Sequence, residues 1–460
     1  MKKHYLALVA AVLLLTGCGR RTYADFTAPQ QGESTLQPVD SIYRESHYEG
    51  VAPTQEPTLR TVRSADGICV IDCKESYYDV RLDYTQSSYY AAGAAYAEAI
   101  RLAREDYAAY CEGYLYENIK AAFPNLNNDY TGIQKRVDAI YSTLDRKYQE
   151  EIDGFADKMN EGAEGFVEDG ILSRDEVVLM QLVPDVLRGT SCSALSASGE
   201  ATATGERITC RLLEWQLGSE NQMCSGHTVL HVQNGDKSYV SVSMLGFMTI
   251  LTAVNDDGLL LGELDVGSGE NMPYTLDGKT SYTYALRYAL EEFSTAKEAA
   301  TYLTEHAKRY PYCVNVLCTD AQDALVAELA VNEEDGIPVI REGDSPLNDG
   351  LVWEDPAYLC AVNSFAAKGN SDGLVHNVGN IVRWNRYADL FCGQRDLTLD
   401  RFKELMTCEK IDDDGLTRIR GGGLVHMLIA DYSTHRMQAI LTGTEGVTDE
   451  QVFVDLGSWD

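Results

Sequence analysis

Helical and strand-like patterns occupy separate blocks of this chain, and that separation limits the folds available to it. Residues 87–147 are rich in Ala, Glu and Tyr and have a helical pattern, which Pro124 divides in two. Another helix is expected after Ser173, which forms a capping box with Glu176. After Thr190, short strand-like runs alternate with turns. Segregated blocks of this kind predict an α+β fold.

The second block contains two strong hairpin signals and a few returning helices. Asn234-Gly235 separates two alternating runs, and the run VNVLCTDAQDALVAELA (314–330) resembles a second hairpin. Strands are also expected at 67–71 and as a final pair within the last 40 residues. The remaining predicted helices are 281–293, 294–309 with Ser294 as its cap, 381–392 and 398–408.

The N-terminal residues have the composition of an export signal. Lys2 and Lys3 precede an apolar run, 6–15, that is too short to span about 30 Å of hydrocarbon comfortably. The following Leu15-Thr16-Gly17-Cys18 resembles the bacterial lipobox, which implies removal of residues 1–17 and lipidation of Cys18. An ordinary signal sequence with a chance cysteine is the alternative. We therefore expect a protein anchored by lipid to the outer face of the cell membrane.

Residues 18–66 are polar, aperiodic and interrupted by prolines, so they are predicted to form a disordered tether. The chain has 71 acidic and 38 basic residues, a formal net charge of −33. That charge argues against binding to nucleic acid, whose phosphates require a basic surface.

Eleven cysteines remain besides Cys18, and an odd number leaves at least one thiol without an intramolecular partner. Such a thiol is a candidate nucleophile. Cys224, His227 and His231 have a spacing that resembles a zinc site. However, residues 228–233 resemble a strand, where the two histidines would merely share a face. We expect no metal and no cofactor.

The segment that begins at Cys192 carries the most specific pattern. A cysteine is followed by a small, Ser-rich strand, a Gly turn and the sequence Arg211-Leu212-Leu213-Glu214-Trp215. This resembles the start of the cysteine-type N-terminal-nucleophile (Ntn) hydrolases. The resemblance is to the linear amide C–N hydrolases related to penicillin acyltransferase and choloylglycine hydrolase. Three further stretches match that family in order and contain Asn255, Asn363 and Arg383, with Arg386 behind the last.

The resemblance implies an αββα sandwich of two antiparallel sheets with helical outer layers. Residues 67–191 would form a helical N-terminal part or pro-segment, and residues 192–460 the core that begins at the nucleophile. It also implies hydrolysis or transfer of a small acyl amide. Family substrates include conjugated bile acids, penicillins, N-acyl amino acids and acyl amides, and the sequence does not choose among them.

The chemistry explains the residue types. Cleavage before Cys192 frees an α-amine whose ordinary pKa of about 8 suits a general base. The guanidinium of Arg211 favours the thiolate. By resemblance, Asn255 and Asn363 donate to the oxyanion, Glu214 orients the α-amine, and Arg383 fixes Glu214 or Asn363 or contacts the substrate.

Structural alternatives remain for each of these residues. In these alternatives Cys192 packs as a small hydrophobe, Arg211 and Glu214 form a surface pair, and Asn255 occupies a left-handed turn position. Likewise, Asn363 caps a loop and Arg383 is a solvated helix residue.

The chain also departs from the family at three positions. Glu214 stands where the family has Asp, Leu212 where it has Asn, and Ser191 where many members have Gly. The alternative function is therefore a binding lipoprotein without catalysis. The tyrosines of the helical block are expected to pack, or else to line an acyl pocket.

Overall fold

The computed structural model describes residues 48–52, 58–160, 162–187, 191–235, 237–266, 276–370, 378–412, 415–448 and 450–460. The predicted signal peptide, Cys18 and most of the predicted tether lie outside these residues. No helix in the described ranges is long and apolar enough to cross a membrane. The eleven cysteines at 69 and beyond are all free thiols.

The first of two large sheets has the strand order β1-β19-β18-β17-β6-β5-β14. All its neighbouring strands are antiparallel except β1 and β19. Its strands are β1 (Tyr48–Ala52), β5 (Ser193–Ala197), β6 (Ile208–Glu214), β14 (Tyr358–Val362), β17 (Leu424–Asp431), β18 (Arg436–Leu441) and β19 (Gln451–Ser458). A separate small pair consists of β15 (Glu409–Asp412) and β16 (Gly415–Arg418).

The second large sheet has the order β13-β12-β11-β10-β9-β8-β7-β4-β3-β2. It is antiparallel apart from the parallel pair β4 and β7, where the segment before Cys192 joins the segment after it. Its strands are β2 (Arg60–Arg63), β3 (Cys69–Cys73), β4 (Tyr78–Asp83), β7 (His227–Asn234), β8 (Lys237–Met244), β9 (Thr252–Asn255), β10 (Leu260–Asp265), β11 (Val314–Thr319), β12 (Ala324–Leu329) and β13 (Val339–Arg341).

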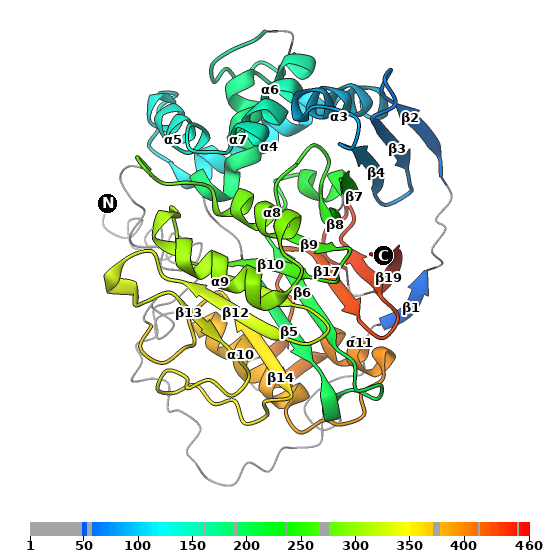
Figure 1. Cartoon of the computed structure of the whole chain (residues 1–460), viewed down its shortest axis with the longest axis vertical. Coiled ribbons are helices and arrows are strands. Elements are labelled where there is room, and N and C mark those ends of the chain that lie inside the picture. Colours follow the sequence, from blue (N-terminus) through cyan, green and yellow to red (C-terminus); the bar gives the residue numbers. More distant parts are fainter. Residues whose placement is uncertain are drawn as a thin grey trace, which may run out of the picture.

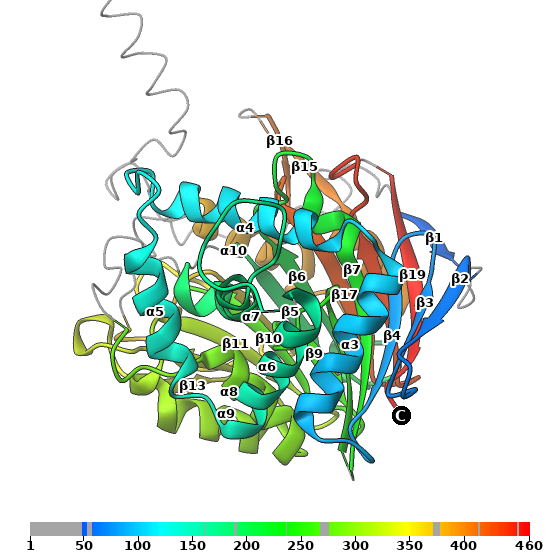
Figure 2. The same ribbon diagram turned by 90° about the horizontal axis from the view of Figure 1, so that it is seen from above.

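The two sheets pack face to face and are covered by helices on their outer sides. Apolar side chains of both sheets, such as Leu213 and Leu264, belong to one shared core. α8 (Tyr282–Glu292) and α9 (Ala296–His306) cover the second sheet (Figure 2). α10 (Val378–Phe391) and α11 (Leu399–Thr407) cover the first sheet. This arrangement confirms the predicted α+β sandwich with helical outer layers.

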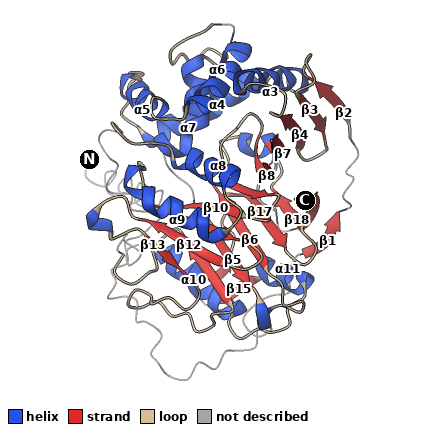
Figure 3. Cartoon of the chain, viewed as in Figure 1, coloured by secondary structure: helices blue, strands red, loops and turns tan. Residues whose placement is uncertain are grey.

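The helical block before Cys192 gathers at one end of the molecule, at the top of Figure 1. Figure 3 shows this concentration of helices beside the strands. Breaks at 104–106 and 142–145, besides the one near Pro124, divide residues 89–160 into four helices rather than the two predicted. They are α3 (Tyr89–Ala103), α4 (Tyr107–Ala122), α5 (Thr131–Tyr141) and α6 (Arg146–Asn160), followed by α7 (Arg174–Val186).

Two of the predicted helix caps differ in outcome. Ser173 and Glu176 form the capping box of α7, as predicted. The cap of α9 is Thr295, not Ser294, because Thr295 pairs with Glu298 three residues later in a complete capping box. Ser294 instead accepts a hydrogen bond from Lys237. The hairpins β7–β8 and β11–β12 and the final pair β17–β18 are confirmed.

The prediction that residues 18–66 form a tether is wrong for two segments. β1 pairs with β19, and β2 pairs with β3, so both are edge strands of the large sheets. These strands are short and mostly exposed, which leaves little hydrophobic periodicity in their sequence. Their order depends on partner strands and not on local propensity.

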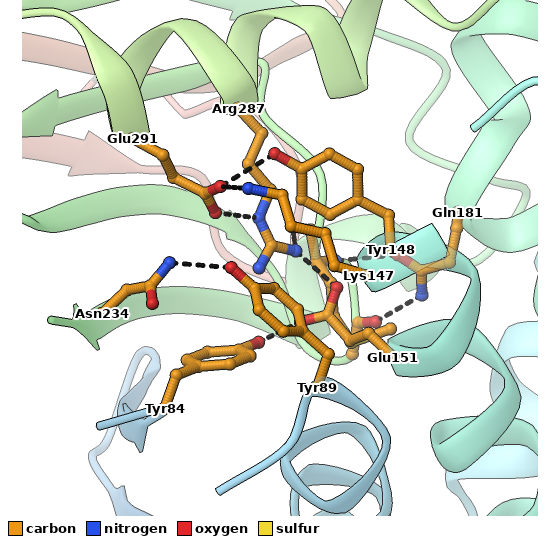
Figure 4. Close-up of polar contacts among 11 residues, drawn as sticks. Tyr84, Tyr89, Lys147, Tyr148, Glu151, Gln181, Asn234, Arg287 and Glu291 are labelled. Carbon is orange, nitrogen blue, oxygen red and sulfur yellow. Dashed lines mark hydrogen bonds and ion pairs between the residues drawn. The ribbon is translucent and has the colours of Figure 1, made fainter. Parts of the chain in front are cut away.

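A buried network of charged and tyrosine side chains joins α6 to α8 (Figure 4). The Arg287 guanidinium of α8 pairs with Glu151 of α6 and with Glu291 of its own helix, and Lys147 of α6 also pairs with Glu291. Tyr84, Tyr148 and Tyr89 surround these groups, with hydrogen bonds from Tyr84 to Glu151 and from Tyr148 to Glu291. Two cations and two carboxylates balance, as buried charges require.

Candidate active site

Cys192 lies at the start of β5, directly opposite the end of β6. The register pairs Ser193 with Leu212, and the Ser191 N–H donates to the Glu214 carbonyl at 2.8 Å. Cys192 is therefore opposite Leu213, and cross-strand neighbours share one face of a sheet. Both side chains belong to the core between the two sheets. The thiol is buried in the uncut chain, while Ser191 is exposed.

The main-chain atoms of Cys192 are held by two of the predicted site residues. Its N–H donates to Asn363 Oδ1, and its carbonyl oxygen accepts from Arg383 Nη1 at 2.8 Å. Asn363 follows β14, the strand next to β5, and Arg383 projects from α10. Asn363 Nδ2 donates to the Asp265 carbonyl at 2.6 Å. In the uncut chain Asn363 therefore accepts a hydrogen bond from the nitrogen that cleavage would convert to the α-amine.

Glu214 keeps a carboxylate in the site despite its extra methylene. Its Oε2 accepts from Arg383 Nη2 at 2.9 Å, and its Oε1 accepts from the Gly421 N–H. Arg383 Nη2 also lies 3.4 Å from Ser191 Oγ. Because the side chains of Glu214 and Arg383 are both mostly buried, solvent screens this ion pair only weakly. One arginine thus links Glu214 to the Cys192 backbone.

Arg211 contacts the sulfur of Cys192 from within the core. Its Nη2 lies 3.4 Å from Cys192 Sγ and also donates to the Glu263 carbonyl. The acidic partner of Arg211 is Glu263 of β10, whose Oε2 lies 3.9 Å from Nη2. The surface pair of Arg211 with Glu214 that the sequence left open is therefore not formed.

Asn255 is not brought into this cluster. Its Nδ2 donates to the carbonyls of Leu290 and Phe293, and its Oδ1 accepts from the N–H groups of Asp257 and Leu259. Both amide hydrogens are used at the end of α8, so the side chain has no donor left for an oxyanion. The correction is that Asn255 organises the turn between β9 and β10.

Two residues of the site were not identified from the sequence. Glu263 carries no motif signal, and only its pairing with buried Arg211 reveals it. Asn380 of α10 donates to the Asn363 carbonyl at 2.8 Å and to Ser364 Oγ at 2.7 Å, which fixes the turn that presents Asn363. Asn380 lies three residues before Arg383, so both side chains share one face of the helix. That shared face was the sequence signal from which Asn380 could have been identified.

Leu212, one of the departures from the family pattern, does not face the sulfur. It belongs to the second core cluster, which packs the outer face of the first sheet against α10 and α11. Arg386, the residue behind Arg383, is also buried. The departure at Leu212 therefore removes no group from the cluster around Cys192.

An apolar cavity lies between the end of β6 and the helices α4 and α7, with about 710 Å³ of empty space that includes open solvent at its mouth. Its wall includes Leu213, the cross-strand neighbour of Cys192, and Trp215. The opposite wall comes from α4, with Tyr110 and Tyr114, and from α7, with Val183. Part of the predicted tyrosine lining is therefore present.

The zinc-like residues do not converge. His227 Nε2 lies 3.0 Å from the Thr442 carbonyl, and burial lowers the pKa of His227 to about 4. His231 lies 3.7 Å from Asp79. Within the described ranges, no three His, Cys, Asp or Glu side chains are grouped to hold a metal ion.

Comparison with known proteins finds similarity among solved structures. No protein-family model and no curated protein matches the chain. The N-acylethanolamine-hydrolyzing acid amidase ortholog of Caenorhabditis elegans is 14% identical, with a TM-score of 0.38, over 52% of this chain and 92% of that chain. A variant of the conjugated bile acid hydrolase of Clostridium perfringens is 12% identical, with a TM-score of 0.34, over 54% and 89%.

Proposed function

We propose that this chain is a cysteine-type Ntn hydrolase that cleaves a linear amide C–N bond with Cys192 as its nucleophile. The observation that carries the proposal is the pair of contacts on this one residue. The Arg211 guanidinium lies at its sulfur, and Asn363 accepts from its backbone nitrogen. A nucleophilic thiol and its own α-amine both need polar partners of these kinds.

The reaction starts with hydrolysis of the Ser191–Cys192 peptide bond, which consumes one water and frees the Cys192 α-amine. Asn363 Oδ1 already accepts a hydrogen bond from this nitrogen, and the Arg383–Glu214 pair lies next to it. The amine can take the thiol proton, because its ordinary pKa lies near neutrality. Arg211 then stabilises the thiolate that forms.

The thiolate attacks the substrate carbonyl, and the tetrahedral oxyanion collapses to a thioester. The departing amine takes the proton held by the α-amine, and water or an acceptor amine then releases the acyl group. Since Asn255 has no free amide hydrogen, we assign the oxyanion role to Asn363 alone, which would exchange its bond to the Asp265 carbonyl for one to the oxyanion.

The apolar cavity that Leu213 lines supports an apolar acyl group as the part of the substrate next to the scissile bond. Leu213 lies opposite Cys192, so a chain bound through the thioester would extend along Leu213 and Trp215 towards α4. Burying each methylene of such a chain is worth about 0.8 kcal/mol. We therefore propose an acyl amide with an apolar acyl chain. We also propose that a lipid on Cys18 anchors the enzyme outside the cytoplasm.

The test compares the purified protein with Cys192→Ala and, as a matched control, Cys392→Ala. Cys392 is a partly exposed thiol that directly follows α10. Denaturing electrophoresis should show fragments that end at Ser191 and begin at Cys192, in the parent and the control but not in Cys192→Ala. A panel of N-acyl amides of increasing chain length should release free amine only where the cut occurs.

Failure of the proposal would be plain in the same experiment. An uncut parent chain whose Cys192 does not react with iodoacetamide would exclude the nucleophile role. Equal amine release by Cys192→Ala and the parent would exclude it as well.

A further inference from the structure

Arg211 and Glu263 form an ion pair in the dry interior between the two sheets. Both side chains have an exposed fraction of 0%. Arg211 Nη2 lies 3.9 Å from Glu263 Oε2 and 3.4 Å from Cys192 Sγ, and it also donates to the Glu263 carbonyl. A single nitrogen of the guanidinium therefore faces both the carboxylate and the sulfur.

A guanidinium in this position needs a negative partner, because removal of a charge from water costs several kcal/mol. Glu214, the carboxylate nearest in sequence, already pairs with Arg383 on the backbone side of Cys192. Glu263 is the acidic side chain that lies within ion-pair distance of Arg211 among the described residues. Two separate ion pairs thus flank the nucleophile.

The strand β10 is shaped to receive the Arg211 side chain. Gly262 precedes Glu263, and a Cβ added to Gly262 would lie 2.8 Å from Arg211 Cγ. A real Cβ atom does not approach a neighbour so closely, so the glycine leaves room for the Arg211 stem. The main-chain oxygen of the next residue, Glu263, then accepts a hydrogen bond from the guanidinium, and the Glu263 carboxylate lies 3.9 Å from Nη2.

We propose that Glu263 is a positioning residue that holds the Arg211 guanidinium against Cys192 Sγ and shares the positive charge of Arg211 with that sulfur. The proposal rests on the proposed function, since it concerns the same nucleophile. Its consequence is that Glu263 limits how strongly Arg211 stabilises the thiolate, so that the neutral thiol persists until substrate and α-amine are in place.

Other charged and titratable groups around Arg211 and Cys192 stay unchanged in the test. His426 of β17 lies in the same interior; burial lowers its pKa, and the nearby Arg211 charge lowers it further, so His426 is neutral. His227 lies behind it, with the two rings 6.4 Å apart. The Arg383–Glu214 pair faces the backbone of Cys192, where the α-amine would also lie. Asp265 contributes its main-chain carbonyl there, which accepts from Asn363 Nδ2.

The experiment measures the rate of Cys192 alkylation by iodoacetamide from about pH 5 to about pH 9, in the parent protein and in Glu263→Gln. Without the Glu263 carboxylate, the positive charge of Arg211 would act on the thiolate with no competing anion, so the pKa of the thiol should fall by about one unit. Below the midpoint, the alkylation rate should therefore rise about tenfold.

The matched control is Glu151→Gln, which removes another fully buried carboxylate from an arginine pair but lies in the α6–α8 network. It should lower the urea midpoint of unfolding and leave the alkylation midpoint unchanged. A merely structural Glu263 would behave in the same way, and an unshifted midpoint in Glu263→Gln would overturn the proposal.

A second variant covers the case in which Glu263→Gln does not fold. Glu263→Asp keeps the charge but draws the carboxylate, and Arg211 with it, away from the sulfur. Its alkylation midpoint should therefore move to higher pH, and an unchanged midpoint would count against the proposal. A parent protein whose Cys192 is never alkylated would instead overturn the proposed function itself.

Discussion

Cys192 lies between two arginines that act on different atoms. Arg211 reaches the sulfur from the interior of the sandwich, and Arg383 reaches the carbonyl oxygen from α10. Each arginine has its own carboxylate, Glu263 or Glu214, so neither cation depends on the nucleophile for its balance. In the proposed reaction, this division would allow the charge on the Cys192 sulfur and the position of its backbone to be controlled separately.

We expect Gly262→Ala to impair the reaction without removing any functional group. The added methyl group would lie 2.8 Å from Arg211 Cγ and must displace the arginine stem. Because a displacement near 1 Å at a reacting group costs up to about 100-fold in rate, kcat/KM should fall by about 10- to 100-fold. Steady-state kinetics with the best N-acyl amide gives the measurement.

The control for this change is Gly132→Ala on α5, where an added Cβ meets nothing within 4 Å. It should leave kcat/KM unchanged. If Gly262→Ala has parent activity, Arg211 does not need the position that the structure gives it.

For single residues, the order and type of residues in the sequence were enough to predict most members of the cluster around Cys192. The sequence prediction was wrong or incomplete where the role of a residue depends on a neighbour in three dimensions. Cys192, Arg211, Glu214, Asn363 and Arg383 come together as a cluster. Asn255 does not, because its amide is used by the end of α8. Glu263 was missed, because a carboxylate in a strand has no meaning until the buried cation opposite it is known.

Asp185 connects two helices and makes the stability of that connection depend on pH. It lies near the end of α7, and its carboxylate accepts from Ser281 Oγ, Thr283 Oγ1 and the Tyr282 N–H at the start of α8. Burial raises the pKa of Asp185 to about 7, against the opposing effect of these hydrogen bonds. The folded protein therefore favours the protonated form.

We expect the parent protein to lose stability as the pH rises through about 7. The folded pKa lies above the ordinary value of 3.8, so the stabilisation is complete below pH 3.8 and disappears above the folded pKa. The full effect is about 4 kcal/mol at most. Asp185→Asn should therefore lose less stability than the parent between about pH 5 and pH 8, measured by urea unfolding.

Asp153→Asn is the control. Asp153 lies on the neighbouring α6, is partly exposed, and pairs with Arg174 of α7. Its pH dependence should follow that of the parent. Identical slopes for Asp185→Asn and the parent would show that the Asp185 carboxyl keeps an ordinary pKa.

Elements with their own local signals were predicted well, and those that depend on distant partners were not. Ser173 and the Asn234-Gly235 turn mark boundaries that the structure confirms. The edge strands β1 and β2 have no such signal, because their hydrogen bonds go to β19 and β3. The breaks between α3 and α4 and between α5 and α6 lack a proline, which is why two helices were expected where four occur.

The segment before Cys192 is built into both sheets of the sandwich. β2, β3 and β4 continue the second sheet beyond β7, and β1 lies at the edge of the first. β4 pairs with β7 along the whole length of β4, from Tyr78 with Thr228 to Asp83 with Gln233. Loss of this segment would expose the edge of β7, which is a risk for aggregation.

The buried α6–α8 network adds a second connection across the proposed cut before Cys192. Glu151 and Lys147 come before Cys192, and Arg287 and Glu291 come after it. Tyr148 and Gln181 also bond across the cut, to Glu291 and to the Gly246 carbonyl (Figure 4). These contacts are independent of the peptide bond that joins Ser191 to Cys192.

We therefore expect the two fragments to remain one particle after cleavage before Cys192. Size-exclusion chromatography in native buffer should give a single species with the mass of the uncut chain, while a denaturing gel resolves two bands. Arg287→Leu should weaken the association, because it leaves two buried carboxylates without their shared cation at a cost of about 3–5 kcal/mol. Its fragments should separate at a lower urea concentration than those of the parent.

Arg146→Leu provides the matched control, since Arg146 lies on the same α6 but is 87% exposed and pairs only with Glu150 four residues away. An exposed pair of this type contributes less than about 1 kcal/mol, so its urea midpoint should match that of the parent. Elution of the fragments as separate species in native buffer would show that the sheet and the network do not hold the halves together. Equal urea midpoints for Arg287→Leu and Arg146→Leu would show that Arg287 is not needed to hold the two fragments together.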